Sequence, residues 1–156
     1  MRRWLKKICL TLLICFVLLQ FYQPARNKSN GQDLSKDFVT TYNAPDSIKK
    51  ILHTSCYDCH SNNTNYLWYD YIQPARMLVE SHIKRGKREL NFNEWADYST
   101  RKQGSKLKGI IKQVQEGEMP IKSYTMLHTS AKLNATEKEH LINWLNFLAN
   151  KENYSN

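Results

Sequence analysis

Two cysteines and a histidine form the motif that is best placed to do chemistry. Cys56, Cys59 and His60 lie in Ser-Cys-Tyr-Asp-Cys-His, which contains the pattern C-x-x-C-H. Two thiols at this spacing on a helical turn can each add to a vinyl group of the same porphyrin, and the adjacent histidine is then held beside the iron. The motif predicts one covalently attached haem c, with Cys56 and Cys59 as attachment sites and His60 as the proximal iron ligand.

Three other kinds of site can use a C-x-x-C pair. Structural zinc usually needs four ligands, and no third cysteine follows residue 26, although other histidines keep this option open. A thioredoxin-like redox pair is expected in a βαβ context, of which the sequence shows no sign. A disulfide between Cys56 and Cys59 would not require His60. The pattern therefore favours haem over these alternatives.

A methionine in a polar turn is the best candidate for the second iron ligand. Met119 lies in Gly117-Glu118-Met119-Pro120, just after the end of a predicted helix. Pro120 restricts Met119 to an extended backbone, which suits a side chain that must point inward. We predict Met119 as the distal ligand, with His82 as the alternative. Further candidates are Met126, His53, His128 and His140.

Aromatic residues are frequent near the motif and in the later loops. Trp68, Tyr69, Trp95 and Tyr124 are candidates for the haem pocket. Large rings commonly pack around a cofactor, and their hydroxyl or indole N–H groups can donate hydrogen bonds to a haem propionate. Core packing without a role in the pocket is the alternative for each of them.

Helical periodicity dominates the segments that must position these residues. An apolar stripe follows Pro45 and runs into Cys56, a second helix is expected from near Pro74 to near Gly86, and a third over residues 105–115 ends at Gly117. Thr136 followed by Glu139 predicts a capping box at the start of the last helix. No segment shows convincing strand alternation. The predicted fold class is all-α.

The N-terminal segment is apolar and follows a cluster of positive charges. Residues 8–22 read ICLTLLICFVLLQFY. They lack the small residues of a cleavage site, so we expect an uncleaved single-pass transmembrane anchor that contacts the membrane through residues 4–22. The positive charges predict a cytoplasmic N-terminus, which places the rest of the chain on the periplasmic or extracytoplasmic side. The expected organisation is an anchor (1–26), a tether (27–40) and one domain (41–156).

Length and charge restrict the function further. The chain has 156 residues and a formal net charge of +9, but five of its 23 Lys and Arg residues flank the apolar segment. The remainder is only mildly basic, which argues against nucleic-acid binding. The residues after the anchor are enough for one compact domain, so we expect one functional site.

The chain resembles the small haem-binding domain proteins related to mono-haem c-type cytochromes. The matching segments are SCYDCHSNNTNYLWY (55–69), the helix around His82, LNFNEW (90–95), GEMP (117–120), SYTMLH (123–128) and LINWL (141–145). The resemblance implies a cytochrome-c-like helical fold, haem attachment at Cys56 and Cys59, and ligation by His60, with Met119 at the usual distal position. Thr129 departs from the pattern, in which proline is expected.

These observations predict a membrane-tethered carrier of single electrons that serves redox partner proteins on the extracytoplasmic face. We do not expect an enzyme. The alternative is a small haem enzyme, for instance peroxidase-like, or a gas or redox sensor with an open distal site. His82 with Arg85 or Arg88 is the candidate acid–base pair for such a site. A structural subunit of a larger respiratory complex is a third possibility.

Overall fold

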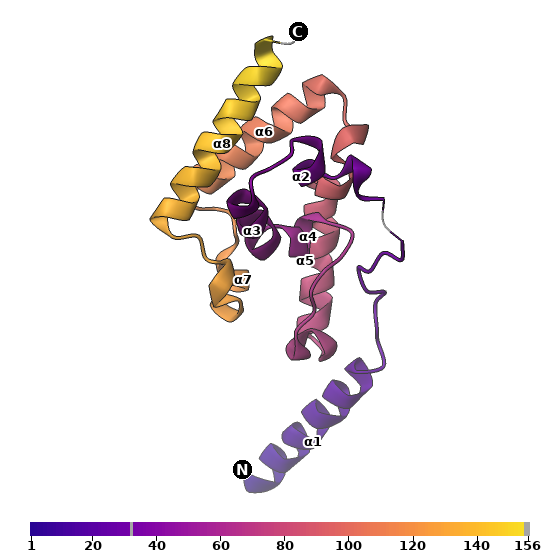
Figure 1. Ribbon diagram of the computed structural model, residues 1–156. Helices are drawn as coiled ribbons and strands as arrows, with labels where there is room; N and C mark the ends of the chain where they lie inside the picture. Colours follow the sequence, from indigo (N-terminus) through magenta and orange to yellow (C-terminus); the bar gives the residue numbers. More distant parts are fainter. Residues whose placement is uncertain (32, 155–156) are drawn as a thin grey trace.

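A computed structural model describes residues 1–31 and 33–154, and all regular structure in them is helical. Figure 1 shows a group of packed helices with one further helix, α1, at its lower end. This confirms the all-α fold class. The elements are α1 (Arg2–Leu19), η1 (Leu34–Lys36), α2 (Phe38–Thr41), α3 (Asp46–Ser55), α4 (Tyr57–His60), η2 (Trp68–Tyr71), α5 (Ala75–Glu89), η3 (Phe92–Asp97), α6 (Thr100–Glu116), α7 (Lys122–Leu127), η4 (Thr129–Ala131) and α8 (Ala135–Tyr154).

Helices α6 and α8 lie side by side and supply much of the core (Figure 1). Their apolar residues recur at helical spacing, so each helix presents one apolar stripe to the other. The buried residues of the pair include Leu107, Ile111, Val114, Leu141, Leu145, Leu148 and Ala149. Helix α3 joins the same core through Ile48, Ile51 and Leu52. The core therefore fixes the end of α3, from which the C-x-x-C-H motif continues.

An aromatic cluster closes the other side of this core. Phe38 and Trp95 are fully buried, with ring centroids 4.6 Å apart in an edge-to-face arrangement. Phe92, Tyr42 and Trp144 also contact Phe38 through ring pairs. Phe38 lies within the range predicted as a tether (27–40), so the end of that range forms part of the packed domain.

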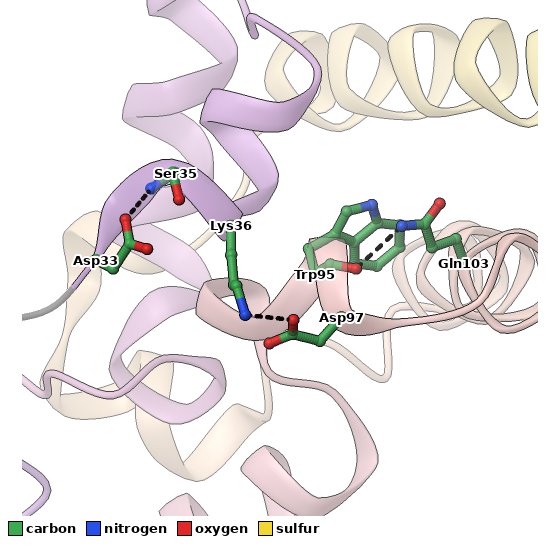
Figure 2. Close-up of polar contacts among 6 residues, drawn as sticks. All are labelled: Asp33, Ser35, Lys36, Trp95, Asp97 and Gln103. Carbon is green, nitrogen blue, oxygen red and sulfur yellow. Dashed lines mark hydrogen bonds and ion pairs between the residues drawn. The ribbon is translucent and has the colours of Figure 1, made fainter.

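The segment before Phe38 is attached to η3 by polar contacts (Figure 2). Asp33 accepts a hydrogen bond from the Ser35 N–H and caps η1, and Lys36 forms an exposed ion pair of 2.6 Å with Asp97. The Gln103 side chain donates to the Trp95 carbonyl at 3.0 Å and links α6 to η3. Of these contacts, the Lys36–Asp97 ion pair links the residues before Phe38 to η3.

Two predicted helix ends can be compared directly with the structure. Gly117 ends α6 in the left-handed conformation, with φ of 72°, which confirms the predicted stop. The capping box predicted at Thr136 and Glu139 is wrong. The box is formed two residues earlier, where Asn134 and Glu137 exchange hydrogen bonds between side chain and backbone N–H at 2.9 and 3.0 Å. Asn is a strong N-cap residue, so the helix begins at the earlier signal.

Helix α1 has no buried residue. It carries Arg2, Arg3, Lys6 and Lys7 within its 18 residues. Among the described helices, none has both the length and the apolar character needed to cross a bilayer.

Candidate functional site

The C-x-x-C-H motif forms one helical turn that directly follows α3. The Cys56 carbonyl accepts hydrogen bonds from the backbone N–H groups of Cys59 and His60, at 3.2 and 3.0 Å. Tyr57 is buried and anchors this turn in the core. The two thiols and the imidazole therefore leave one short turn, formed by α4 and by Cys56 at its N-cap.

The imidazole of His60 is held by the backbone of α5 and its C-terminal end. Its Nδ1 lies 3.0 Å from the Gly86 carbonyl oxygen and 3.1 Å from that of Leu90. Carbonyl oxygens only accept, so Nδ1 carries the proton and Nε2 keeps a free lone pair. Burial lowers the pKa of His60, which favours the neutral ring. A neutral imidazole whose second nitrogen donates to the backbone is the usual form of a metal-binding histidine.

Helix α5 approaches the motif so closely that only glycine fits at position 86. A Cβ atom on Gly86 would come within 2.7 Å of the Cys59 carbonyl oxygen. The missing side chain thus allows the contact between α4 and α5. The same residue provides the carbonyl that accepts from His60.

Both cysteines of the motif carry free thiols. Burial raises the pKa of Cys56 to about 12 and that of Cys59 to about 11, so both are protonated at neutral pH. No disulfide joins Cys56 to Cys59 in the structure.

A cavity of about 340 Å³ lies against the motif. Its walls bring together both thiols, His60 and both candidates for the second ligand. The lining residues that matter here are Cys56, Cys59, His60, His82 and Met119. A neighbouring cavity of about 390 Å³ shares Cys56, His60 and Met119, and another of about 220 Å³ shares Cys59 and His82. The three cavities surround α4.

Met119 and His82 reach this space from different elements. Met119 follows Gly117, and its backbone N–H donates to the Gln113 carbonyl at 3.2 Å, which fixes the loop on the end of α6. Its side chain is 37 % exposed. His82 lies on α5, one turn before Gly86. The structure thus places both predicted ligands at the cavity of His60, whereas His53 contacts the ring of Tyr57.

A family model described as a haem-binding domain matches residues 14–147. The chain belongs to the haem-binding domain family. Comparisons with curated proteins and with solved structures found no match.

The residues of this haem-binding domain fit the group that its family is named for. The cavities lie against two free thiols, and His60 has a free lone pair at Nε2. The lining is largely apolar, with Ile121, Leu78 and Val79 among its residues. Within the described residues, no group of three or more His, Cys, Asp or Glu side chains is arranged to hold a metal ion directly.

The four predicted pocket aromatics separate into two groups. Tyr69 and Tyr124 line the cavities beside Cys59. Trp68 is 76 % exposed, and Trp95 lies in the aromatic core with Phe38. Neither tryptophan lines one of the three cavities around α4. The sequence did not distinguish the two tyrosines that line the cavities from the two tryptophans that do not, because this difference arises from tertiary packing.

Sequence reasoning missed Asp58, which lies between the two cysteines. Its carboxylate accepts hydrogen bonds from the Tyr124 hydroxyl at 2.7 Å and from the Asn65 N–H at 2.9 Å. The Tyr124 ring stacks on His128, which also lies within hydrogen-bond distance of the Tyr69 hydroxyl. Burial and the bond to Asp58 raise the pKa of Tyr124, so its hydroxyl remains a donor. Asp58 and Tyr124 are far apart in sequence, and no local signal indicates the pair.

A second missed group supports the motif from the core side. Asp37 is buried and accepts hydrogen bonds from the Tyr57 hydroxyl at 2.9 Å, the Val39 N–H at 2.9 Å and the Asn93 amide at 2.6 Å. The Tyr57 ring stacks on Phe92, with centroids 5.0 Å apart. Asp37 thereby joins the start of α2, the motif and η3. The capping position of Asp37 before Phe38-Val39 was the one available signal.

Proposed function

We propose that this haem-binding domain attaches one haem c covalently and acts as a membrane-tethered, extracytoplasmic carrier of single electrons. One observation carries the proposal: the two free thiols, the oriented His60 and two candidate second ligands line the same cavity. Cys56 and Cys59 would hold the haem through thioethers, and His60 would bind its iron through Nε2. Haem bound in this way supplies a reversible one-electron iron couple.

The chain's own residues position and protect this site. The Gly86 and Leu90 carbonyls orient His60 and keep its proton on Nδ1. Met119, from the loop after α6, is our proposed distal ligand, with His82 as the alternative. A thioether opposite a histidine raises the reduction potential, whereas a second histidine generally lowers it. The identity of this one residue would thus raise or lower the reduction potential of the protein.

A second candidate function has a specific observation in its favour. Arg85 and His82 line the cavity that contains His60, and Met119 is partly exposed. A histidine with an arginine beside an open iron position could transfer a proton to a bound substrate. This arrangement supports a small haem enzyme or a gas sensor.

Helix α1 supports the proposed membrane attachment. Its exposed apolar residues follow the four positive charges of Arg2, Arg3, Lys6 and Lys7. The apolar run continues past the end of α1 to Tyr22, and this whole segment would lie in lipid with its basic end at the cytoplasmic surface. The helical domain would then meet its redox partner proteins on the extracytoplasmic side.

Absorption spectra distinguish the two functions. The full chain, made together with a cytochrome c maturation system, would be measured oxidised, reduced, and reduced with carbon monoxide. A c-type spectrum that carbon monoxide does not change supports the electron carrier, and a shifted spectrum supports the enzyme or sensor. Met119→Ala should open the iron to carbon monoxide, whereas His82→Ala, the matched control, should not. The reverse pattern would assign the second ligand to His82. A spectrum without haem would contradict the proposal.

A further inference from the structure

Helix α1 is joined to the helical domain by a set of partly buried hydrogen bonds. Gln73 precedes α5 and is buried, and its backbone N–H donates to the Gln20 side-chain oxygen at 3.0 Å. The Gln20 amide donates back to the Gln73 carbonyl at 3.3 Å, and the Gln73 amide donates to the Tyr22 carbonyl. The residue that directly follows α1 is thus bonded in both directions to the start of α5.

Arg76 extends this junction by one turn of α5. Its guanidinium is buried and donates to the Gln23 side-chain oxygen and to the Pro24 carbonyl. Asn27 continues the contact, because its amide donates to the Ser61 carbonyl at 2.8 Å. Residues 20–27 therefore follow the surface of the domain, and α1 leaves from a fixed point. In Figure 1, this point lies at the lower end of α5, next to α1.

The end of the domain at this junction exposes large apolar and aromatic side chains. They come from η2, from the residues after it and from the first turn of α5. We call this surface the η2–α5 end, and it consists of Trp68, Tyr71, Ile72 and Met77, which are exposed by 76, 45, 40 and 42 %. Tryptophan and tyrosine at the end of an apolar segment are typical of the boundary between lipid and water.

Basic side chains border this end. The Arg26 guanidinium lies over the Tyr71 ring at 5.3 Å from its centroid, and Lys28 lies over the Tyr66 ring at 5.7 Å. Of the carboxylates nearby, Glu80 accepts a hydrogen bond from Tyr66 and Asp70 is buried. Positive charge beside exposed apolar surface complements the headgroups of anionic phospholipids.

We propose that the η2–α5 end rests on the same anionic bilayer that takes up α1, so that the domain has one fixed orientation at the membrane. The inference rests on the proposed membrane attachment and deepens it. Its main support is the junction: residues 20–24, which directly follow the exposed helix α1, are hydrogen-bonded to Gln73 and Arg76 beside the η2–α5 end. A second copy or another protein would have no comparable reason to meet this end together with α1.

Spin labels on single thiols can test the orientation in the full haem-loaded chain. Three proteins are needed, each with one reactive cysteine besides the two attached to haem. The first carries Cys9→Ser and reports from the native Cys15 on α1. The second and third carry Cys9→Ser with Cys15→Ser, and add Ile72→Cys or Phe147→Cys. Phe147 is the matched control, because it is 64 % exposed and belongs to α8, a helix whose C-terminal end lies at the opposite end of the molecule from α1 (Figure 1).

The labelled proteins are bound to vesicles of phosphatidylcholine and phosphatidylglycerol, and the accessibility of each label to oxygen and to a water-soluble nickel complex gives its depth. We expect the labels at positions 15 and 72 to be in lipid or at its surface and the label at 147 to be in water. A label at 15 in lipid with a label at 72 in water would overturn the fixed orientation and leave the attachment intact. A label at 15 in water would overturn both.

The junction itself offers a second test. Gln20→Ala removes the reciprocal bonds to Gln73 without touching the domain core. In this variant the label at 72 should become several-fold more accessible to the nickel complex, while the label at 15 keeps its depth. A label at 147 as deep as that at 72, or an unchanged label at 72 in Gln20→Ala, would contradict an orientation set by this junction.

Discussion

The Tyr124 hydroxyl donates a 2.7 Å hydrogen bond to the carboxylate of Asp58, the residue between Cys56 and Cys59. This bond links α7 to the inner part of the C-x-x-C-H motif across one of the cavities. The loop that carries Met119 leads directly into α7. The positions of the motif and of the proposed distal ligand are therefore connected through one charge-assisted contact.

Tyr124→Phe removes this bond and leaves the ring in place. We expect the free energy of unfolding to fall by about 1.5–3 kcal/mol, because the acceptor is charged and partly buried. Urea denaturation monitored by circular dichroism measures the change. Tyr71→Phe is the control, since its hydroxyl is exposed and accepts one 3.5 Å contact from Arg26. Equal stability of Tyr124→Phe and wild type would show that the bond contributes nothing.

Gly86→Ala should disturb both the motif and the proximal histidine. The added Cβ would meet the Cys59 carbonyl oxygen at 2.7 Å, so that α5 must move away from α4. We expect a loss of about 1–3 kcal/mol in the free energy of unfolding and a lower yield of covalent haem. In Gly109→Ala, the Cβ meets nothing within 4 Å, and the helix should gain about 0.5–1 kcal/mol. Equal effects of the two variants would contradict the close contact.

Asp37→Ala should lower the free energy of unfolding substantially, although Asp37 is far from the cysteines in the sequence. It leaves the Tyr57 hydroxyl and the Asn93 amide without their acceptor in the core. An unsatisfied buried donor costs roughly 1–3 kcal/mol, so we expect a loss of at least ~2 kcal/mol. Asp33→Ala, which removes an exposed cap on η1, is the control and should cost less than about 1 kcal/mol. Thermal unfolding of both variants measures the difference.

Asp70 should make stability depend on pH. Burial raises its pKa above the value of about 3.9 in an unfolded chain, Asp58 acts in the same direction, and the Leu67 N–H and His128 oppose the shift. The folded state holds this proton more tightly, so the contribution of Asp70 to stability is complete below the unfolded pKa and is lost as pH rises through the folded pKa.

Asp70→Asn removes this titration and can still accept the bond from the Leu67 N–H. Its free energy of unfolding, relative to wild type, should therefore increase as pH rises from about 4 toward 7. Urea denaturation at unit pH steps measures this difference. Glu139→Gln, which changes an exposed carboxylate on α8, is the control. A difference that stays constant over this range would disprove the role of Asp70.

Local patterns in the sequence predicted the helical fold and the cysteine–histidine turn. The helix stop at Gly117 and the choice of Met119 and His82 as candidate ligands could also be predicted from the residues next to them in the sequence. Asp37, Asp58 and Gly86 did not, because their roles depend on partners that approach only in the folded state. Trp95 shows the same limit, since an indole in the core and one in a pocket look alike in sequence. The last helix is capped at Asn134 and not at Thr136 because two capping signals lie two residues apart and the earlier one is used.

The length of helix α5 determines how far the His60 site lies from the junction with α1. Arg76, near its start, belongs to the junction with α1, and the carbonyl of Gly86, near its end, accepts the hydrogen bond from Nδ1 of His60. The helical rise separates these two residues by about 15 Å along the axis. On a bilayer that holds the junction, with α5 along the membrane normal, His60 would stand this far above the surface. An electron donor or acceptor would have to bring its redox group to this distance from the lipid surface. This favours a partner protein with a domain outside the membrane over a partner whose redox group lies within the lipid.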